Sequence, residues 1–507
     1  MNMLGRKTLL LNPPLINGVA FTRQGRCQER EDVLGTTKPP YTLALIASLL
    51  KGTGAEVRLI DATAARLSVE GVIARLDQEA FTPTLIIFPT TTPTLDGDVA
   101  AMALLKARYG APIFCFGPHA STAPLLSMER APQVDGMFVG EPEDAVVQLA
   151  TLESMSRLIE IPSLTWRETD GSVVPHRGHG TFSGFMSTPF PAWDLLSLED
   201  YSLPLVNKPY VIVETSRGCP YSCDFCVAPI HQGHKFRERS AKQLVDEIER
   251  CYREFGTEFF YLWGDTVTLN VKSFTTFCDE LIARKLPIQW FGNARADNLT
   301  DPAFVHRLKK AGCWMLALGI ETDSEEVRKD MVKRLERQKI ETAFKNMRAA
   351  GIKSFAFFIF GYPGETLQTM DRTVEYAIEL DPDFANFYPA VPYPGTALFD
   401  KVVRDGLLPP GADADWSKME YSYYLLNGNG LNEQTVMNSI QRAKRRFFLR
   451  PGYVARHMGD VARLAASKQA IVGQVLSRMI FGAKVVDTSV PVRNASTPTA
   501  LAEADRP

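Results

Sequence analysis

Two series of short apolar segments alternate with amphipathic helical patterns along this chain of 507 residues. This alternation constrains the fold more than any other feature. The first series fills about residues 1–150, and the second runs from about Tyr210 to Ala390. Strands that alternate with helices at this spacing favour parallel sheets covered by helices. Because the chain is too long for one ordinary core, we expect two or three domains.

The first series predicts a doubly wound, Rossmann-like sheet, whose ligands would bind outside the carboxyl ends of the strands. It contains no GxGxxG pattern, so a nicotinamide or flavin cofactor gains no support. The expected strands are Lys7–Asn12, Val57–Asp61, Leu85–Phe88, Pro112–Gly117 and Gly136–Val139. The expected helices are about Tyr41–Lys51, Ser68–Glu79, Gly97–Tyr109 and Ala120–Glu129.

The second series predicts a partial TIM-type barrel of six strand–helix repeats, with functional residues at the carboxyl ends of its strands. Its expected strands are Tyr210–Glu214, Glu258–Trp263, Ile288–Asn293, Trp314–Ile320, Ser354–Phe360 and Phe384–Ala390. Between the two series, a turn signal at Asp170-Gly171 predicts a hairpin. We therefore expect a doubly wound domain over residues 1–150, a connector over 151–208, a partial barrel over 209–405, a helical region over 406–485 and a disordered tail over 486–507.

Composition narrows the functional classes. Hydrophobic residues make up 45% of the chain and charged residues 22%, as in a soluble globular protein. The formal net charge of −2 offers no field for a polyanion, so we expect no nucleic acid partner. No apolar run reaches the ~18 residues that span a bilayer. Nothing resembles a signal peptide, and the other cysteines are scattered singly, which favours a cytoplasmic location.

A CxxxCxxC pattern is the strongest chemical signal in the chain. Its members are Cys219, Cys223 and Cys226. Three thiolates are one fewer than a four-iron cluster needs, so one iron would stay open for a substrate or cofactor. A zinc site is the rival interpretation. It leaves Cys219 without a role, and its two pairs lie closer together than in a zinc finger. That zinc site would use Cys223, Cys226, His231 and His234.

The pattern lies on a loop after a hydrophobic strand and resembles the signature of the radical S-adenosylmethionine (SAM) superfamily. The resemblance implies that Cys219, Cys223 and Cys226 hold a [4Fe-4S] cluster whose open iron binds SAM. An electron donor such as flavodoxin or ferredoxin would reduce the cluster, which then cleaves SAM to methionine and a 5′-deoxyadenosyl radical. Phe225 would shield the cluster near the adenine.

The same resemblance implies SAM contacts at the strand ends of the barrel. Asp265 would accept hydrogen bonds from the SAM amino group, Arg295 would pair with its carboxylate, and Glu321 would bind the ribose hydroxyls. Gly361 and Gly364 would lie on the adenine side. Each residue also has an ordinary interpretation, because carboxylates at strand ends often cap helices and glycines often mark turns.

The first domain resembles the cobalamin-binding domain that precedes the barrel in one large subclass of the superfamily. The matching pieces include Asn12-Pro13-Pro14, Gly117-Pro118-His119 and Gly140-Glu141-Pro142-Glu143. The implied cobalamin contacts are Asn12, Asp61, Thr90, Thr91, Gly117 and Glu141. The DxHxxG motif is absent, so the cobalt would have no protein histidine. The alternative is an ordinary doubly wound domain without a ligand.

Three functions follow from these resemblances. The first is a cobalamin-dependent methyltransferase that methylates an unactivated carbon in a biosynthetic pathway. The second is a non-methylating oxidative cyclase, or a related radical enzyme, that acts on a lipid-like or tetrapyrrole-type substrate. The third is a cobalamin or metal sensor without catalysis. The sequence assigns no catalytic acid, base or nucleophile and does not identify the small-molecule or lipid-like substrate.

Two helical patterns near the end of the chain combine basic and apolar residues. They cover Arg442–Phe448 and Asp460–Phe481. Such a combination suits a helix on a membrane surface, so we consider peripheral contact with the inner membrane. Packing against the barrel is the simpler interpretation, because apolar stripes usually face a core.

Overall fold

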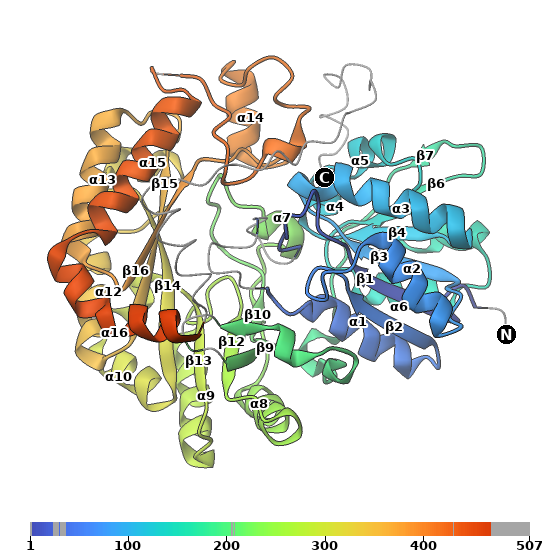
Figure 1. The fold of residues 1–507 in the computed structure, drawn as a ribbon, viewed down its shortest axis with the longest axis horizontal. Helices are drawn as coiled ribbons and strands as arrows, with labels where there is room; N and C mark the ends of the chain where they lie inside the picture. Colours follow the sequence, from blue (N-terminus) through green and yellow to red (C-terminus); the bar gives the residue numbers. More distant parts are fainter. Residues whose placement is uncertain are drawn as a thin grey trace.

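The computed structural model describes residues 3–23, 30, 37–203, 206, 208–428 and 430–467. Two seven-stranded sheets form two domains that lie side by side (Figure 1). In the residues described, no helix is both long enough and apolar enough to cross a membrane.

The first sheet has the order β2-β1-β3-β4-β5-β6-β7. Five parallel strands match the predicted ones closely: β1 (Lys7–Asn12), β2 (Glu56–Asp61), β3 (Leu85–Pro89), β4 (Ile113–Phe116) and β5 (Gly136–Phe138). The predicted hairpin supplies two antiparallel strands, β6 (Leu164–Arg167) and β7 (Val173–Val174). The sheet therefore continues beyond residue 150, into the segment predicted as a connector.

Helices cover both faces of this sheet because β1 is apolar on both faces. Leu10 packs in one core cluster with α1 (Tyr41–Gly52) and α6 (Glu143–Thr151). Leu9 and Leu11 pack in the other with α2 (Val69–Gln78) and α3 (Leu95–Tyr109).

The helix expected over Ala120–Glu129 is two helices, α4 (Pro118–Thr122) and α5 (Pro124–Arg130). The break follows from Pro124, whose ring disfavours helical geometry in Ala123, and Ala123 has φ −146° and ψ 53°.

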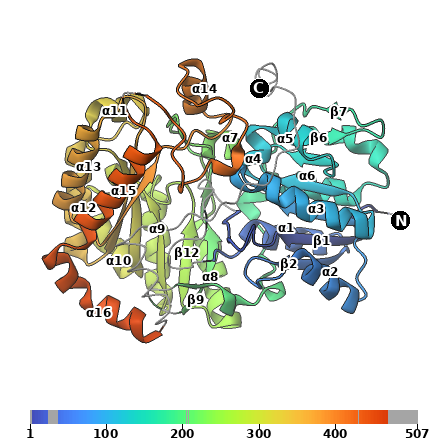
Figure 2. The same ribbon diagram turned by 45° about the horizontal axis from the view of Figure 1, so that its top comes forward.

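The second sheet has the order β16-β15-β14-β13-β12-β9-β8 and forms a half-barrel (Figure 2). Its six parallel strands lie within two residues of the predicted bounds. They are β9 (Lys208–Glu214), β12 (Phe259–Trp263), β13 (Gln289–Ala294), β14 (Cys313–Glu321), β15 (Lys353–Phe360) and β16 (Phe384–Pro389). A short strand, β8 (Ser202–Leu203), pairs antiparallel with β9 at one edge.

Helices cover the outer face of the half-barrel (Figure 1). They are α8 (Ala241–Phe255), α9 (Val271–Arg284), α10 (Pro302–Lys310), α12 (Arg337–Ala350) and α13 (Leu367–Leu380), with the short α11 (Glu325–Asp330) after β14. Capping residues in the sequence set the ends of these helices, as α8 shows. Ser240 and Gln243 form a capping box at the start of α8, and Gly256 ends that helix in the left-handed region.

The described part of the chain ends with α14 (Ala397–Arg404), α15 (Glu433–Phe448) and α16 (Pro451–Ser467). The apolar side of α15 is buried, and its Phe447 ring lies 6.3 Å from the Phe387 ring of β16. This helix therefore packs against the barrel, which does not support the membrane-surface interpretation. Most of the second pattern, Asp460–Phe481, lies outside the described residues, as does the predicted tail 486–507.

Candidate functional site

The three cysteines lie between the two strands of a small ribbon at the carboxyl end of β9. Strand β10 (Ser216–Arg217) precedes them, and the short helix α7 (Ala228–Gln232) and strand β11 (Arg237–Glu238) follow. None of the three thiols is in a disulfide. Cys219 is buried, whereas Cys223 and Cys226 are partly exposed. We refer to residues 218–227 as the cluster loop.

Close contacts fix the cluster loop. Gly218 has φ +81°, and a Cβ atom there would overlap the carbonyl oxygen of Lys235. The Tyr362 hydroxyl donates a hydrogen bond of 2.5 Å to Asp224 Oδ2, and the Leu398 amide donates one of 2.9 Å to the Asp224 carbonyl oxygen. The loop is thus held against the carboxyl end of β15 and the start of α14.

The donor set fits an iron–sulfur cluster, because it consists of three thiols on one loop. Each ligand of such a cluster binds a different iron, so the sulfurs need not converge on one point. No three His, Cys, Asp or Glu side chains in the described part of the chain are arranged around a single metal ion. The four side chains of the zinc alternative are therefore not brought together. Instead, Nδ1 of His231 lies 2.9 Å from the Ser121 hydroxyl.

Of the predicted SAM contacts, Arg295 contacts the cluster loop, and Asp265 lies next to a residue that approaches β10, the strand before the loop. Asp265 follows Gly264, where a Cβ atom would come within 2.5 Å of Ser216 Oγ. The Arg295 guanidinium stacks on the ring of Tyr221, with 3.8 Å from Cζ to the ring centroid. Arg295 also pairs with Asp297 at 3.2 Å. The arginine therefore already contacts both the loop and a carboxylate, and its pairing with SAM stays a prediction.

Glu321 ends β14 in an uncommon conformation. The pairing register of β14 with β15 shifts between Gly319 and Glu321, and Glu321 has φ +69°. Its carboxylate forms a buried ion pair of 2.5 Å with Lys333 Nζ. A backbone outlier of this kind is often found at functional sites. The structure thus holds Glu321 at the carboxyl end of β14. Its contact with ribose stays a prediction.

Gly361 and Gly364 follow β15 and have φ values of +77° and +97°. A Cβ atom on Gly361 would come within 2.5 Å of the Tyr424 ring. Phe225, the predicted shield of the cluster, is partly buried against the barrel core.

Glu365, which directly follows Gly364, is a buried carboxyl group that was not among the predicted site residues. Its Oε2 accepts hydrogen bonds from the amides of Gly361 (2.8 Å) and Tyr362 (3.3 Å), and its Oε1 accepts one from the Thr322 hydroxyl (3.2 Å). Burial raises the pKa of Glu365 to about 8, although these three hydrogen bonds lower it. Glu365 therefore joins the ends of β14 and β15.

At the carboxyl edge of the first sheet, the predicted cobalamin contacts bond to protein groups. Asn12 Nδ2 donates to Asp61 Oδ1 at 2.8 Å, and the Tyr201 hydroxyl donates to Asp61 Oδ2 at 2.9 Å. The Thr90 hydroxyl donates to Asp98 at 3.3 Å, and Thr91 caps the short 3₁₀ helix that follows. These side chains order the edge, and their contact with cobalamin stays a prediction.

A small, open pocket lies at this edge. Strand order reverses between β1 and β3, and such a switch point is where ligands of open parallel sheets bind. Gly117 has φ +122°, and a Cβ atom there would come within 2.5 Å of the Thr90 carbonyl oxygen. The lining residues include Asn12, Arg23, Thr63, Pro89 and Phe116. A switch point beside loops with little side-chain bulk fits a ligand that is held by close backbone contacts, as the predicted cobalamin would be.

His119 is not placed to bind a metal. It is fully buried in α4, with Nδ1 3.1 Å from the Thr92 hydroxyl and Nε2 2.9 Å from the Ser127 hydroxyl. Burial, and then the charge of Arg130, lower its pKa to about 3. Both ring nitrogens are therefore engaged in the neutral form of the ring.

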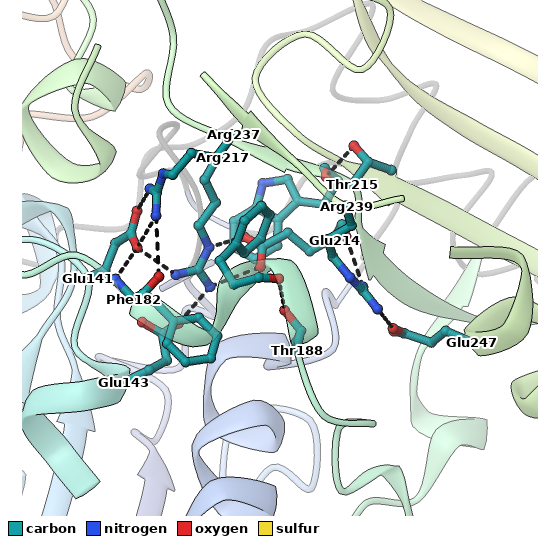
Figure 3. Close-up of polar contacts among 12 residues, drawn as sticks. Glu141, Glu143, Phe182, Thr188, Glu214, Thr215, Arg217, Arg237, Arg239 and Glu247 are labelled. Atoms are coloured by element: carbon teal, nitrogen blue, oxygen red, sulfur yellow. Dashed lines mark hydrogen bonds and ion pairs between the residues drawn. The ribbon is translucent and has the colours of Figure 1, made fainter. Parts of the chain in front are cut away.

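A buried ion network joins the two domains next to the cluster loop (Figure 3). Arg217 Nη2 lies 2.6 Å from Glu143 Oε1 of the first domain and 2.9 Å from Glu214 Oε2 of β9. Arg217 Nη1 lies 3.2 Å from Glu141 Oε2, and Glu141 also pairs with Arg237. Burial raises the pKa of Glu214 to about 7, although Arg217 lowers it. Glu141, a predicted cofactor contact, thus lies in the domain interface.

A second contact brings the carboxyl edge of the first sheet to the cluster loop. The Ser121 hydroxyl of α4 lies 2.9 Å from Nδ1 of His231 in α7, which directly follows the cluster loop. Gly395 approaches α4 so closely that a Cβ atom on Gly395 would come within 3.0 Å of Thr122 Cβ. The ligand-binding edges of both domains therefore meet at one place.

Comparisons with known proteins agree with this architecture. The model of the radical SAM superfamily matches residues 213–377, and that of the B12 binding domain matches residues 32–150. An uncharacterised methyltransferase of Pyrococcus horikoshii is 28% identical over 88% of this chain and 93% of its own length. The anaerobic magnesium-protoporphyrin IX monomethyl ester cyclase of Rubrivivax gelatinosus is 26% identical over 82% of this chain and 75% of its own length.

A solved structure shows the same fold. The radical SAM methyltransferase TsrM from Kitasatospora setae, with cobalamin and a [4Fe-4S] cluster bound, has a TM-score of 0.68 and 19% identity; the match covers 87% of this chain and 91% of that chain. The two matched domains identify the cofactors as a [4Fe-4S] cluster, SAM and cobalamin. The chain therefore belongs to the radical SAM superfamily, among the enzymes that carry a B12 binding domain together with the radical SAM domain.

Proposed function

We propose that this enzyme transfers a methyl group from SAM, by way of cobalamin, to an unactivated carbon of a small-molecule substrate. One observation carries the proposal. The carboxyl edge of the first sheet meets the cluster loop through Ser121 and His231, and the two domains share the ion pair between Glu143 and Arg217. Because both folds bind ligands at these edges, groups bound by the two domains would face one another.

The residues of the chain would bind and orient the reacting groups. Cys219, Cys223 and Cys226 would hold the cluster. The Arg217 ion pairs would keep the ligand-binding edges of the two domains next to one another. When bound, the cluster supplies the electron that cleaves SAM, and cobalamin carries the methyl group. The proposal includes the predicted contacts Asp265, Arg295, Glu321, Gly361 and Gly364 for SAM, and Asn12, Asp61, Thr90, Thr91, Gly117 and Glu141 for cobalamin.

A labelling experiment tests this function. Protein reconstituted without oxygen, with iron, sulfide, cobalamin and a reduced flavodoxin or ferredoxin, would be incubated with candidate substrates and SAM labelled in its methyl group. We expect 5′-deoxyadenosine and a product that carries the label. Failure to form 5′-deoxyadenosine from SAM would leave the sensor interpretation.

A second candidate is the non-methylating oxidative cyclase. The match to the Rubrivivax gelatinosus cyclase over most of both chains favours it. In the labelling experiment, this reaction would yield 5′-deoxyadenosine with a product free of label. The same assay therefore separates the two radical reactions.

A further inference from the structure

We propose that the inner face of the half-barrel binds a flat, conjugated or fused ring system. This inference rests on the proposed function in one respect, because it identifies the bound ring system as the substrate of that site. It follows from the burial pattern of the strands, the arrangement of aromatic rings on the inner face and the distribution of charge along it.

Buried and partly exposed residues alternate along β15 and β16, and along most of β12, β13 and β14. The buried positions face the helices. The Trp290 ring lies 5.6 Å from the Phe274 ring of α9, and the Phe387 ring lies 6.3 Å from the Phe447 ring of α15. The partly exposed positions therefore face the inside of the half-barrel.

In a complete barrel the inner side chains fill the lumen as a packed core. Here the inner aromatic side chains stay partly exposed, among them Tyr261, Phe291, Phe355, Phe357 and Tyr388. Contiguous apolar surface of this kind on a protein commonly marks a binding site. The inner face is thus mostly apolar, with Asn293 and Asn386 as polar positions. The Tyr421 ring covers part of it, 4.2 Å from the Tyr388 ring.

The rings form two walls. On one side, Tyr261 and Phe291 stack with centroids 4.9 Å apart and planes at 7°. On the other side, Phe357 lies 4.6 Å from Phe355 and 5.9 Å from Tyr388, with interplanar angles of 34° and 28°.

Strand β14 separates the walls. Its Met315 pairs in register with Phe291, and its Ala317 pairs with Phe355. Aromatic rings gain extra attraction from another flat π system in an offset-stacked or edge-on arrangement. Two groups of rings, on either side of a strand without aromatic side chains at Met315 and Ala317, therefore favour a flat ligand over a flexible chain.

Charge lies only at the ends of this face. Among the described inner positions of β12–β16, the charged residues are Lys353, at the start of β15, and Glu321, at the end of β14. Glu321 is paired with Lys333. Since the middle of the face is uncharged, the body of the ligand should be uncharged as well.

The walls end close to the cluster loop. Strands β15 and β16 end at Phe360 and Pro389, shortly beyond Phe357 and Tyr388. Tyr362 then bonds to Asp224 of the cluster loop. A ring system bound between the walls would therefore lie next to the predicted SAM site, on the side away from the carboxyl ends of the strands.

Binding of two probes tests this inference without turnover. The reconstituted holoenzyme with SAM would be titrated, in the absence of oxygen, with 1-hydroxypyrene as a fused-ring probe and 1-dodecanol as a saturated linear probe. We expect saturable binding of 1-hydroxypyrene and weaker binding of 1-dodecanol. Phe357→Leu should weaken the binding of 1-hydroxypyrene about three- to tenfold, because it removes the stacking of one ring.

Phe387→Leu is the matched control, since this residue lies on the buried outer face of the adjacent strand. If Phe357→Leu does not retain its cluster, Phe291→Leu applies the same test to the other wall. Equal affinity of the wild type and the wall variant for 1-hydroxypyrene, or preference for 1-dodecanol, would overturn the proposal. Because no methyl transfer is measured, failure of the labelling experiment leaves this result standing, and the reverse also holds.

Discussion

The carboxyl edges of the two sheets use their side chains differently. In the first domain the polar side chains bond to one another: Asn12 and Tyr201 both donate to Asp61. Beside them lie a cavity and a loop whose backbone approaches Gly117. In the barrel, the edge presents three thiols outside disulfides, above an inner face of aromatic rings. The first edge thus offers shape and backbone, and the second offers specific donor atoms.

This difference determines how well each site can be recognised from the sequence alone. A cluster needs thiolates, and only cysteine supplies them, so the spacing of Cys219, Cys223 and Cys226 is diagnostic. A ligand that is held by shape and backbone leaves only small residues and turns. The following experiments perturb one edge at a time, in order of decreasing expected effect.

The largest effect should come from the thiols. Alanine at Cys219, Cys223 or Cys226 should abolish formation of 5′-deoxyadenosine, because a cluster that loses one of three protein ligands is not held. Cobalamin binding, measured from its visible absorption, should persist because it depends on the other domain. Cys251→Ala, in α8, is the control and should keep SAM cleavage. Activity in any one of the three variants would contradict the ligand assignment.

Glycine substitutions sharpen the comparison. Gly218→Ala would place a Cβ atom against the Lys235 carbonyl oxygen, whereas Gly233, with a similar φ of +77°, has no such neighbour within 4 Å. We expect Gly218→Ala to lose most of its iron. Gly233→Ala should cost only the backbone penalty, about 1 kcal/mol. Iron content after reconstitution measures both, and equal iron in the two variants would show that close approach does not shape the loop.

The corresponding pair in the first domain is Gly117 and Gly110. Gly117→Ala would crowd the Thr90 carbonyl oxygen, while Gly110, with φ +64°, has open space around it. Gly117→Ala should weaken cobalamin binding by at least about tenfold, as roughly 1.4 kcal/mol of strain would do. Gly110→Ala should bind cobalamin normally, and both variants should keep their cluster. A loss of iron in Gly117→Ala would show that the two edges are not independent.

The sequence predicted the strands well, and it placed the three cysteines on a loop after the first barrel strand, because both depend on local patterns. Apolar strands of three to nine residues and the CxxxCxxC spacing need no knowledge of distant partners. The ion network could not be predicted in this way, since Arg217 and Glu143 lie 74 residues apart and either charge could equally face solvent. The inner aromatic face was missed for a related reason, because a period of two does not say which face of a strand the helices cover.

Arg217 tests whether the two edges must be held together. Lysine keeps the charge but lacks the planar fork that reaches Glu143 and Glu214 at once. Arg217→Lys should therefore lower the ratio of product to 5′-deoxyadenosine about tenfold while SAM cleavage continues. Arg253→Lys, at an exposed ion pair with Glu249 on α8, is the matched control and should leave this ratio unchanged. An equal loss of both products would indicate damage to the cluster loop instead.

The smallest effect on activity, and a clear one on stability, should come from Glu365. Burial raises its pKa to about 8 from an ordinary value of 4.5, so the folded state binds this proton more tightly than the unfolded state does. Stability from this group is therefore fully present below about pH 4.5 and is lost as pH rises toward 8. At 1.36 kcal/mol per pKa unit, the loss amounts to at most roughly 3–5 kcal/mol.

Glu365→Gln separates this titration from the shape of the motif. The Gln side-chain oxygen can still accept from the amides of Gly361 and Tyr362, and its amide group can meet the Thr322 hydroxyl. Thermal unfolding midpoints between pH 5 and 8.5 should fall more steeply for the wild type than for this variant. Glu375→Gln, at an exposed carboxylate of α13, should follow the wild type. Parallel curves for the wild type and Glu365→Gln would mean that the carboxyl ionises in the folded protein without cost, and that Glu365 stabilises the end of β15 as an anion.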